Sequence, residues 1–317
     1  MKTVVLDAGT FGDDLDLSPL SEFGELVIFR STRPEETAER LRGADIAVIN
    51  KHRMNASTLC GVTSLKLVCV FATGYDNIDL AYCAERGIAV CNAVGYSTAS
   101  VTQFTLAAAL SLISHLPQYS GYVAGGAYSS GTAANRLEPV YHEIAGRQWG
   151  VAGFGNIGSS VARAAAALGC RVAAYSRHEK PGAVFMSLDE LCATSDIISL
   201  HLPLSDATRG IVDRRRIAMM KPGCILINAA RGAVTDEAAV ADAVLDGRIA
   251  GFGCDVYSTE PFGADHPFSR LLGLPNVCLT PHMAWGSYEA RVRCLGEVVS
   301  NIRSFLSGGK RCRVDLL

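Results

Sequence analysis

The sequence lacks a strong charge of either sign. Its 29 lysines and arginines nearly balance 31 aspartates and glutamates, so the formal net charge is only -2. A protein that binds nucleic acid or an anionic membrane through a general electrostatic field carries a clear basic excess. We therefore expect neither nucleic acid nor a membrane as a partner, and any anionic ligand must bind at a local site.

Paired cysteine motifs are also missing. The eleven cysteines are scattered singly, and no Cys-x-x-Cys pair occurs. This spacing fits neither a disulfide framework nor a zinc site, and we expect no metal. Most of the cysteines lie in apolar runs such as residues 67–70, where a free thiol packs as a small hydrophobic side chain. Free thiols favour a reducing compartment, so we expect a cytoplasmic protein.

Long hydrophobic runs are absent as well. The longest weakly polar stretch, residues 104–116, is shorter than the ~20 apolar residues that span a membrane. Asp7 interrupts the first apolar run too early for a secretory signal. We expect neither a membrane helix nor a signal peptide in this sequence.

The sequence does contain a regular alternation of short Val-, Ile- and Leu-rich runs with longer helical patterns. Such alternation is typical of parallel sheets with crossover helices. The first series of apolar runs is 3–6, 26–29, 46–49, 67–71 and 88–91; the second is 149–152, 172–175, 197–200, 224–228, 249–254 and 277–279. A length of 317 residues also favours two domains, at roughly 150 residues each. We predict an α/β protein with two Rossmann-like, doubly wound parallel-sheet domains and an active-site cleft between them.

Two helical patterns and one irregular segment predict the domain boundaries. A helix from residue 97 to 116 should end at Pro117 and lead into the second domain. The last helix, residues 287–306, is long enough to return to the first domain. Residues 117–148 are rich in glycine and too long for an ordinary connection, so they either pack against another subunit or form a surface loop.

A glycine-rich loop follows the strand at residues 149–152. Gly153, Gly155 and Gly158 form Gly-x-Gly-x-x-Gly directly before a strong helix-forming stretch. The first glycine allows the tight turn, the second lets backbone approach a pyrophosphate, and the third lets helix and strand pack closely. The pyrophosphate then lies at a helix N-terminus. We therefore predict that residues 98–285 bind a dinucleotide and that residues 1–97 plus 286–317 form a discontinuous substrate-binding domain.

The residues after the next strand bear on the choice of nucleotide. An acidic side chain there selects NAD by binding the 2′-hydroxyl of the adenosine ribose. Here the strand at 172–175 ends in Ser176, Arg177 and His178, and the nearest acid is Glu179. A small hydroxyl followed by arginine suits a 2′-phosphate better. We predict NAD(P)H as cofactor, with a preference for NADPH.

Three later strands each end near one ionisable residue: Arg231, Glu260 and His282. Arginine offers a fixed fork of donors to a carboxylate or oxyanion. Histidine can exchange a proton with a carbonyl oxygen near neutral pH, and a neighbouring carboxylate fixes its tautomer. These residues, with the cofactor loop, predict hydride transfer to a carbonyl beside a carboxylate. Structural roles remain the alternatives: a helix cap or an interdomain ion pair for Arg231, an ordinary turn residue for Glu260 and a merely structural histidine for His282.

The other histidines carry no such pattern. His52 follows Lys51 and either lines the predicted cleft or lies in a solvated loop, and the loop position is favoured. His266 is expected at the surface.

Several motifs, in order along most of the chain, carry a family resemblance. They are Asn50-Lys51, residues 72–79, residues 91–96, Asn228-Ala229-Ala230-Arg231-Gly232, Asp255 through Glu260-Pro261, and Thr280-Pro281-His282-Met283-Ala284-Trp285. Together they resemble the D-isomer-specific 2-hydroxyacid dehydrogenase family, and most of all its glycerate dehydrogenase and hydroxypyruvate reductase branch.

The resemblance implies roles for individual residues. Arg231 would bind the substrate, His282 would be the acid/base, and Glu260 would orient it. The implied substrate-binding residues are Lys51, Thr73, Gly74 and Trp285; the implied cofactor-binding residues are Gly153, Gly155, Asn156, Ile157, Gly158, Ser176, Arg177, His201, Pro203, Ala229 and Asp255. Lys51 could instead be a surface lysine, and Trp285 could be core packing. The resemblance also implies a homodimer formed through the cofactor domains.

The expected function is reversible reduction of a small 2-oxo acid, with hydroxypyruvate or glyoxylate first, to a D-2-hydroxy acid. Fold alone would also permit a dinucleotide-sensing, corepressor-like binding protein. A D-lactate-type dehydrogenase is the enzymatic alternative. The intact Arg231, Glu260 and His282 set favours an enzyme.

Overall fold

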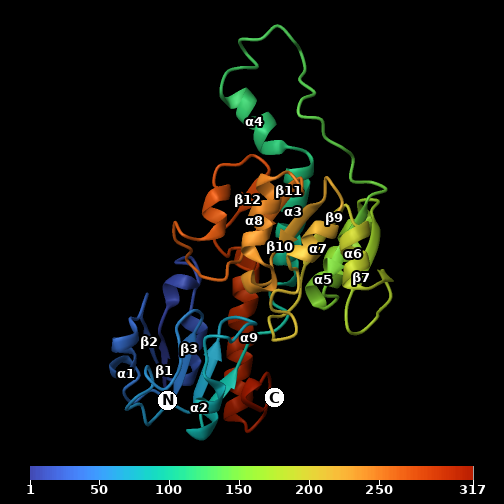
Figure 1. The fold of residues 1–317 in the computed structure, drawn as a ribbon. Helices are drawn as coiled ribbons and strands as arrows, with labels where there is room; N and C mark the ends of the chain where they lie inside the picture. The colour runs from blue at the N-terminus through green and yellow to red at the C-terminus, as the bar shows by residue number, and fades with distance from the viewer. Residues whose placement is uncertain (317) are drawn as a thin grey trace. The chain divides into compact units, whose positions relative to one another are not determined.

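The computed structural model describes residues 1–316 and divides the chain into two compact units. The first unit contains residues 1–97 together with the chain from Trp285 onward, and the second contains Thr98–Ala284. Each unit is built on its own parallel sheet (Figure 1). The predicted fold class, two α/β domains with parallel sheets, is confirmed.

The first unit has a five-stranded parallel sheet in the order β2-β1-β3-β4-β5. Its strands are β1 (Lys2–Val5), β2 (Glu25–Ile28), β3 (Ile46–Ile49), β4 (Leu67–Val70) and β5 (Ala89–Cys91). Every residue of β3 and β4 is buried, as expected for parallel strands covered on both faces.

The helices of the first unit are short except for the last. They are α1 (Thr37–Arg40), α2 (Leu80–Glu85) and α9 (Tyr288–Leu306). Ala290, Cys294, Val298 and Ile302 recur every four residues along α9, so they share one helix face, and all are buried in one core cluster with the sheet. The Ser287 side chain begins α9 by accepting the N–H of Ala290.

The second unit has a seven-stranded parallel sheet in the order β12-β11-β10-β9-β6-β7-β8 (Figure 1). The strands are β6 (Gln148–Ala152), β7 (Arg171–Tyr175), β8 (Val184–Phe185), β9 (Ile197–Leu200), β10 (Ile225–Asn228), β11 (Gly251–Cys254) and β12 (Val277–Leu279). The chain builds outward from β6 in both directions, so the strand order reverses between β6 and β9. Open α/β sheets bind ligands at the carboxyl ends of strands at such a reversal.

Helices cover both faces of this sheet. On one face α3 (Thr98–Ile113) and α5 (Asn156–Ala167) share a buried cluster with β6. On the other face α6 (Leu188–Thr194), α7 (Arg214–Met219) and α8 (Glu237–Leu245) form a second cluster. The sheet is therefore a rigid platform whose strand ends carry the candidate site.

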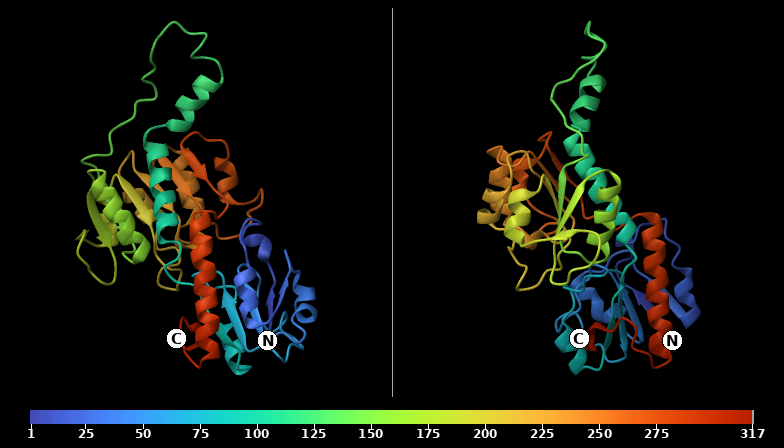
Figure 2. Two further views of the ribbon diagram at one scale, coloured as in Figure 1. Left: turned by 180° about the vertical axis from the view of Figure 1, so that it is seen from behind. Right: turned by 90° about the vertical axis from the view of Figure 1, so that its right-hand side faces the viewer.

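The expectation that Pro117 ends a helix is wrong. Helix α3 ends at Ile113, His115 takes a left-handed conformation (φ +50°), and a second helix, α4 (Leu116–Ala124), begins there. Proline fits this position because the first helical turn has no intrahelical partner for its missing N–H. Helix α4 and the segment after it extend away from the sheet of the second unit in both views of Figure 2.

Residues 1–316 contain neither a single helix that could span a membrane nor a cluster of metal-binding side chains. No single helix there is long and apolar enough to cross a membrane; α3 and α4 reach that length only as a pair bent by 65°. Within the same residues, no cluster of three His, Cys, Asp or Glu side chains could hold a metal ion.

Candidate active site

The turn after β6 is built so closely that its first and third glycines tolerate no side chain. Gly153 has a left-handed φ of +97°, and a Cβ there would lie 2.6 Å from the carbonyl oxygen of His201. At Gly158, in the first turn of α5, a Cβ would lie 1.9 Å from the carbonyl oxygen of Gly153. These two glycines therefore bring the helix N-terminus down onto the end of the strand.

The second glycine of the loop, in contrast, has open space around its Cα. Gly155 is exposed, and a Cβ there would have no atom within 4 Å. As the N-cap of α5 it has no side chain to bind the first-turn N–H groups, which include those of Asn156 and Ile157. An open approach to a helix N-terminus suits an anion, so the residues present fit the pyrophosphate of a dinucleotide.

The end of β7 carries no carboxylate among residues 175–178. Ser176 is half-buried, and its Oγ accepts the N–H of His178 at 3.4 Å. Arg177 is exposed, as is the nearest acid, Glu179. A guanidinium is therefore available next to the position where a ribose is expected.

His201 and Pro203 directly follow β9. The N–H of His201 donates to the Ala152 carbonyl at 2.7 Å, which ties this strand end to the start of the glycine loop. Both ring nitrogens of His201 are enclosed and have no hydrogen-bond partner within residues 1–316. Burial lowers the pKa of His201 to about 3, so its ring is neutral at physiological pH.

His282 and Glu260 form the central pair of the site. His282 Nδ1 lies 2.7 Å from Glu260 Oε2, and Glu260 Oε1 accepts the N–H of Tyr257 at 3.0 Å. The carboxylate is thus held by backbone on one side and bonded to the imidazole on the other. A proton on Nδ1 places the ring's basic lone pair on Nε2, as an acid/base facing a substrate requires.

Asp255 holds the backbone on which His282 sits. Its Oδ1 accepts the N–H of Met283 at 2.8 Å and the hydroxyl of Thr280 at 2.6 Å, and its Oδ2 accepts the N–H of Ala284 at 2.8 Å. His282 itself has a left-handed φ of +54°, which costs energy for a non-glycine residue. Burial raises the pKa of Asp255, while these hydrogen bonds act in the opposite direction. Sequence reasoning predicted Asp255 only as a cofactor contact, and this supporting role was not predicted.

Arg231 lies in a tight turn after β10. Asn228 shapes the turn: its side-chain amide donates to the Arg231 carbonyl at 3.0 Å and accepts the N–H of Ala230 at 3.1 Å. At Gly232 a Cβ would lie 2.1 Å from the carbonyl carbon of Tyr257, so this turn packs against the loop that carries Glu260. The half-buried Ala229 precedes the turn.

The three catalytic candidates therefore come from neighbouring strands. Arg231 follows β10, Glu260 follows β11 and His282 follows β12, and these strands are adjacent in the sheet. Parallel strands end at the same edge, so the structure brings the three segments to one edge of the second unit. The same edge carries the glycine loop after β6.

The predicted substrate residues Lys51, Thr73 and Gly74 lie in the first unit, also after strands. Lys51 is exposed after β3, in a turn whose N–H groups from Asn50 to His52 donate to the buried carboxylate of Asp7. Thr73 follows β4 and donates its hydroxyl to the Ala93 carbonyl at 2.8 Å. No sequence motif indicated that Asp7 holds this turn.

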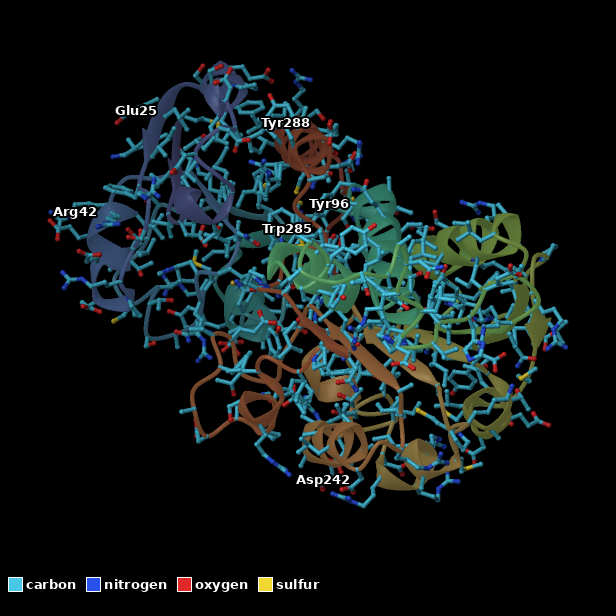
Figure 3. All side chains as sticks on the ribbon, turned by 90° about the horizontal axis from the view of Figure 1, so that it is seen from above. Glu25, Arg42, Tyr96, Asp242, Trp285 and Tyr288 are labelled. Carbon is cyan, nitrogen blue, oxygen red and sulfur yellow. The ribbon has the colours of Figure 1, made fainter. Side chains whose placement is uncertain are left out.

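Trp285 is half-buried in the first unit. Its ring meets Tyr96 edge to face at 6.1 Å and Phe71 at 6.4 Å; Tyr96 and Trp285 are labelled in Figure 3. The packing role left open by the sequence is therefore observed, and the substrate-binding role remains a prediction.

Two histidines expected in solvent are buried instead. His52 is 8% exposed, and its Nε2 lies 2.8 Å from the Thr37 hydroxyl. His266 is also 8% exposed, and its Nε2 lies 3.0 Å from Glu237. Each ring nitrogen therefore lies next to a polar group that is far away in the sequence.

Comparisons with known proteins agree with this geometry. Residues 106–284 match the family model described as D-isomer specific 2-hydroxyacid dehydrogenase, NAD binding domain. The chain is 37% identical to a hydroxypyruvate reductase of Blautia hydrogenotrophica, over 97% of this chain and 98% of that protein. It is 37% identical to a glycerate dehydrogenase of Methylorubrum extorquens, over 87% of each chain.

A solved structure resembles the whole chain. The acyclic imino acid reductase Bsp5, in complex with NADPH and D-Arg, has a TM-score of 0.87 and 29% identity and covers 99% of both chains. The family expected from the sequence is confirmed. The protein belongs to the D-isomer specific 2-hydroxyacid dehydrogenase family, and its NAD-binding domain lies in the second unit.

Proposed function

We propose that this protein reversibly reduces a small 2-oxo acid, with hydroxypyruvate and glyoxylate as the first candidates, to the D-2-hydroxy acid. The 2.7 Å pair of His282 and Glu260 carries the proposal, because a histidine bonded to a carboxylate suits an acid/base, and the pair follows strands next to β10, which precedes Arg231. The relatives named hydroxypyruvate reductase and glycerate dehydrogenase support this choice of substrate.

Each residue has a defined part in the proposed reaction. When bound, the reduced nicotinamide supplies a hydride to the carbonyl carbon. Arg231 holds the substrate carboxylate and the carbonyl oxygen through its fork of donors. His282 gives its proton to that oxygen as the hydride arrives, and Glu260 stabilises the protonated imidazole. In the reverse direction His282 takes the proton back.

Residues of the first unit are proposed to bind the substrate. The backbone at Thr73 and Gly74 would donate to the substrate carboxylate, and Lys51 would add positive charge. Trp285 would limit the size of the substrate. Exposure of Lys51 after β3 and the position of Thr73 after β4, at the carboxyl edge of that sheet, support these roles.

NADPH is proposed as the preferred cofactor. The second unit is an NAD-binding domain of its family, but β7 ends in Ser176 and the exposed Arg177 rather than in a carboxylate. A guanidinium favours the 2′-phosphate of NADPH through charge-assisted hydrogen bonds. His201 and Pro203 would lie on the adenosine side.

A homodimer is proposed to form through α4 and residues 125–147, the segment that extends away from the sheet in Figure 2. This segment exposes Leu116, Val123, Leu137, Val140 and Tyr141, each more than half accessible. An exposed apolar surface of this kind typically marks an interface. Sedimentation should give a dimer for the wild-type protein and a monomer for L137D/V140D, while L272D, at another exposed leucine, stays dimeric.

A cytoplasmic location is proposed because the cysteine thiols form no disulfides. All eleven cysteines are free and most are buried, and burial raises the pKa of Cys192 to about 11. Buried thiols without disulfides suit a reducing compartment.

A substrate panel tests the proposed function. Purified protein is assayed with hydroxypyruvate, glyoxylate, pyruvate and branched 2-oxo acids, each with NADH and NADPH. The proposal expects the highest kcat/KM for hydroxypyruvate or glyoxylate. A clear preference for pyruvate would favour the D-lactate alternative, and nucleotide binding without turnover of any 2-oxo acid would favour the sensing protein.

A further inference from the structure

Glu237 is a buried carboxylate with no part in the reaction described above. It is the first residue of α8 and is only 9% exposed. Its Oε1 accepts the N–H of Ser258 at 2.8 Å, and its Oε2 accepts the Ser258 hydroxyl. The same Oε2 lies 3.0 Å from Nε2 of His266.

The tautomer of His266 follows from its second ring nitrogen. Nδ1 accepts the N–H of Phe268 at 3.2 Å, so the ring proton lies on Nε2, which is 3.0 Å from Glu237 Oε2. The rings of Tyr257, Phe262 and Phe268 surround His266, with centroids 6.0, 4.9 and 5.1 Å away. The Glu237 carboxylate thus accepts two hydrogen bonds from Ser258 and lies beside the Nε2–H of His266 within an aromatic shell, where a lost polar contact is costly.

Glu237 contacts both ends of the loop that carries Glu260. Most of residues 258–265 are exposed, but Ser258 at one end is hydrogen-bonded to the Glu237 carboxylate, and His266 at the other end lies 3.0 Å from the same carboxylate. Glu260 lies between them. Glu237 therefore anchors a loop that has little packing of its own.

The anchored end of the loop also touches the segments of the other two catalytic candidates. The Tyr257 hydroxyl donates to the Thr280 carbonyl at 2.8 Å, two residues before His282. The backbone at Tyr257 and Ser258 packs against Gly232, next to Arg231. The anchored end is thus packed between the segments of His282 and Arg231, and Glu260 is the catalytic candidate that the loop itself carries.

We propose that Glu237, with His266, is a positioning residue for catalysis, holding the Glu260 loop so that Glu260 meets His282. This inference rests on the proposed function, because it assigns Glu237 an effect on turnover through Glu260. It concerns orientation alone, since Glu237 contacts the loop and not the reacting groups.

The variants E237Q, E260Q and E237Q/E260Q test the proposal. In E237Q the new amide NH2 faces a donor in either orientation, Ser258 N–H on one side and His266 Nε2–H on the other. We expect E237Q to lower kcat by about tenfold, since small misplacements of reacting groups have effects of this size. The Kd for NADPH should stay unchanged, and E237D, which keeps the carboxylate, should restore part of kcat.

The double variant separates positioning from general destabilisation. If Glu237 acts through Glu260, E237Q/E260Q turns over no more slowly than E260Q, because the shared interaction is already lost. Multiplicative losses would overturn the proposal, as would wild-type kcat in E237Q. E289Q, an exposed glutamate in the first turn of α9, serves as the matched control and should match wild type.

The variants S258A and E260Q cover the cases in which E237Q does not fold or the proposed function is wrong. If E237Q does not fold, S258A removes only the hydroxyl bond to Glu237, and its smaller loss of kcat must likewise vanish in the E260Q background; a loss that persists there overturns the inference. Wild-type turnover in E260Q itself would contradict the proposed function. Loss in E260Q with none in a folded E237Q would reject the positioning role alone.

Discussion

His282 Nδ1 lies 2.7 Å from Glu260 Oε2, although the two residues follow different strands of the sheet. Asp255 holds the backbone beneath the histidine, and the N–H of Tyr257 holds the other carboxylate oxygen of Glu260. Hydrogen bonds to neighbouring groups therefore hold both Glu260 and the backbone of His282, and this favours one orientation of the imidazole. Pre-positioning of this kind lowers the cost of proton transfer.

Replacing His282 should remove the proposed acid/base and leave cofactor binding largely intact. We expect H282N to lower kcat by about 10³-fold, within the range attributed to a positioned general acid. Binding of NADPH, measured by fluorescence titration, should be retained. H142N, at an exposed histidine of the second unit, is the control and should keep full activity. A kcat in H282N close to that of wild type would refute the assigned role.

Replacing Arg231 should affect binding and chemistry together. R231A loses the fork for carboxylate and carbonyl oxygen, so KM for the 2-oxo acid should rise and kcat should fall, each by about tenfold or more. R231K keeps the charge without the fork and should recover only part of the loss. R163A, at an exposed arginine of α5, is the control. Loss of thermal stability with unchanged kinetics would point instead to a structural ion pair.

Asp255 should matter for stability as well as for turnover. In D255N the amide NH2 must face at least one of the donors Met283 N–H, Ala284 N–H or Thr280 hydroxyl. An unsatisfied buried donor costs about 1–3 kcal/mol of unfolding free energy. Urea unfolding of D255N should show a loss of this size, with reduced kcat, whereas exposed D246N shows neither. Unchanged unfolding free energy in D255N would contradict the supporting role.

His201 predicts a pH dependence of stability. Its pKa is lowered from 6.5 to about 3 in the folded protein, so between these values the unfolded chain binds a proton that the folded chain does not. Stability therefore falls as pH drops below 6.5, with a slope approaching about 1.4 kcal/mol per pH unit. Urea unfolding between pH 7 and pH 4 should show a shallower decline for H201Q than for wild type or for exposed H178Q. Equal slopes in all three proteins would rule out this contribution.

Arg177 predicts the nucleotide preference. R177A should raise KM for NADPH by about tenfold, the size expected from losing a charged hydrogen bond, and should leave KM for NADH nearly unchanged. R171A, an exposed arginine at the other end of β7, is the control. If R177A leaves KM for NADPH at its wild-type value, Arg177 does not bind the 2′-phosphate.

Much of the fold was predictable because its signals are local. Runs such as Ile46–Ile49 are apolar throughout, and Gly153, Gly155 and Gly158 follow a strand at the required spacing. The catalytic candidates were also found locally, as single ionisable residues after apolar strands. Pro117 was misjudged because proline is compatible with both the start and the end of a helix.

The supporting groups were missed because their partners are distant in sequence. Asp255 binds backbone at Met283 and Ala284, and Glu237 binds Ser258 and His266. No short motif encodes such bonds, because they arise only when strands β10, β11 and β12 lie side by side. His266 was placed at the surface for the same reason.

Transfer of deuterium from NADPH to the substrate shows whether the protein reduces a 2-oxo acid by hydride transfer. NADPH deuterated at the transferred position is incubated with hydroxypyruvate and the protein, and the product is analysed by mass spectrometry and chiral chromatography. We expect D-glycerate with deuterium on the carbon that bears the new hydroxyl, formed about 10³-fold more slowly by H282N. Unlabelled product, L-glycerate, or no reduction of any 2-oxo acid would contradict this expectation.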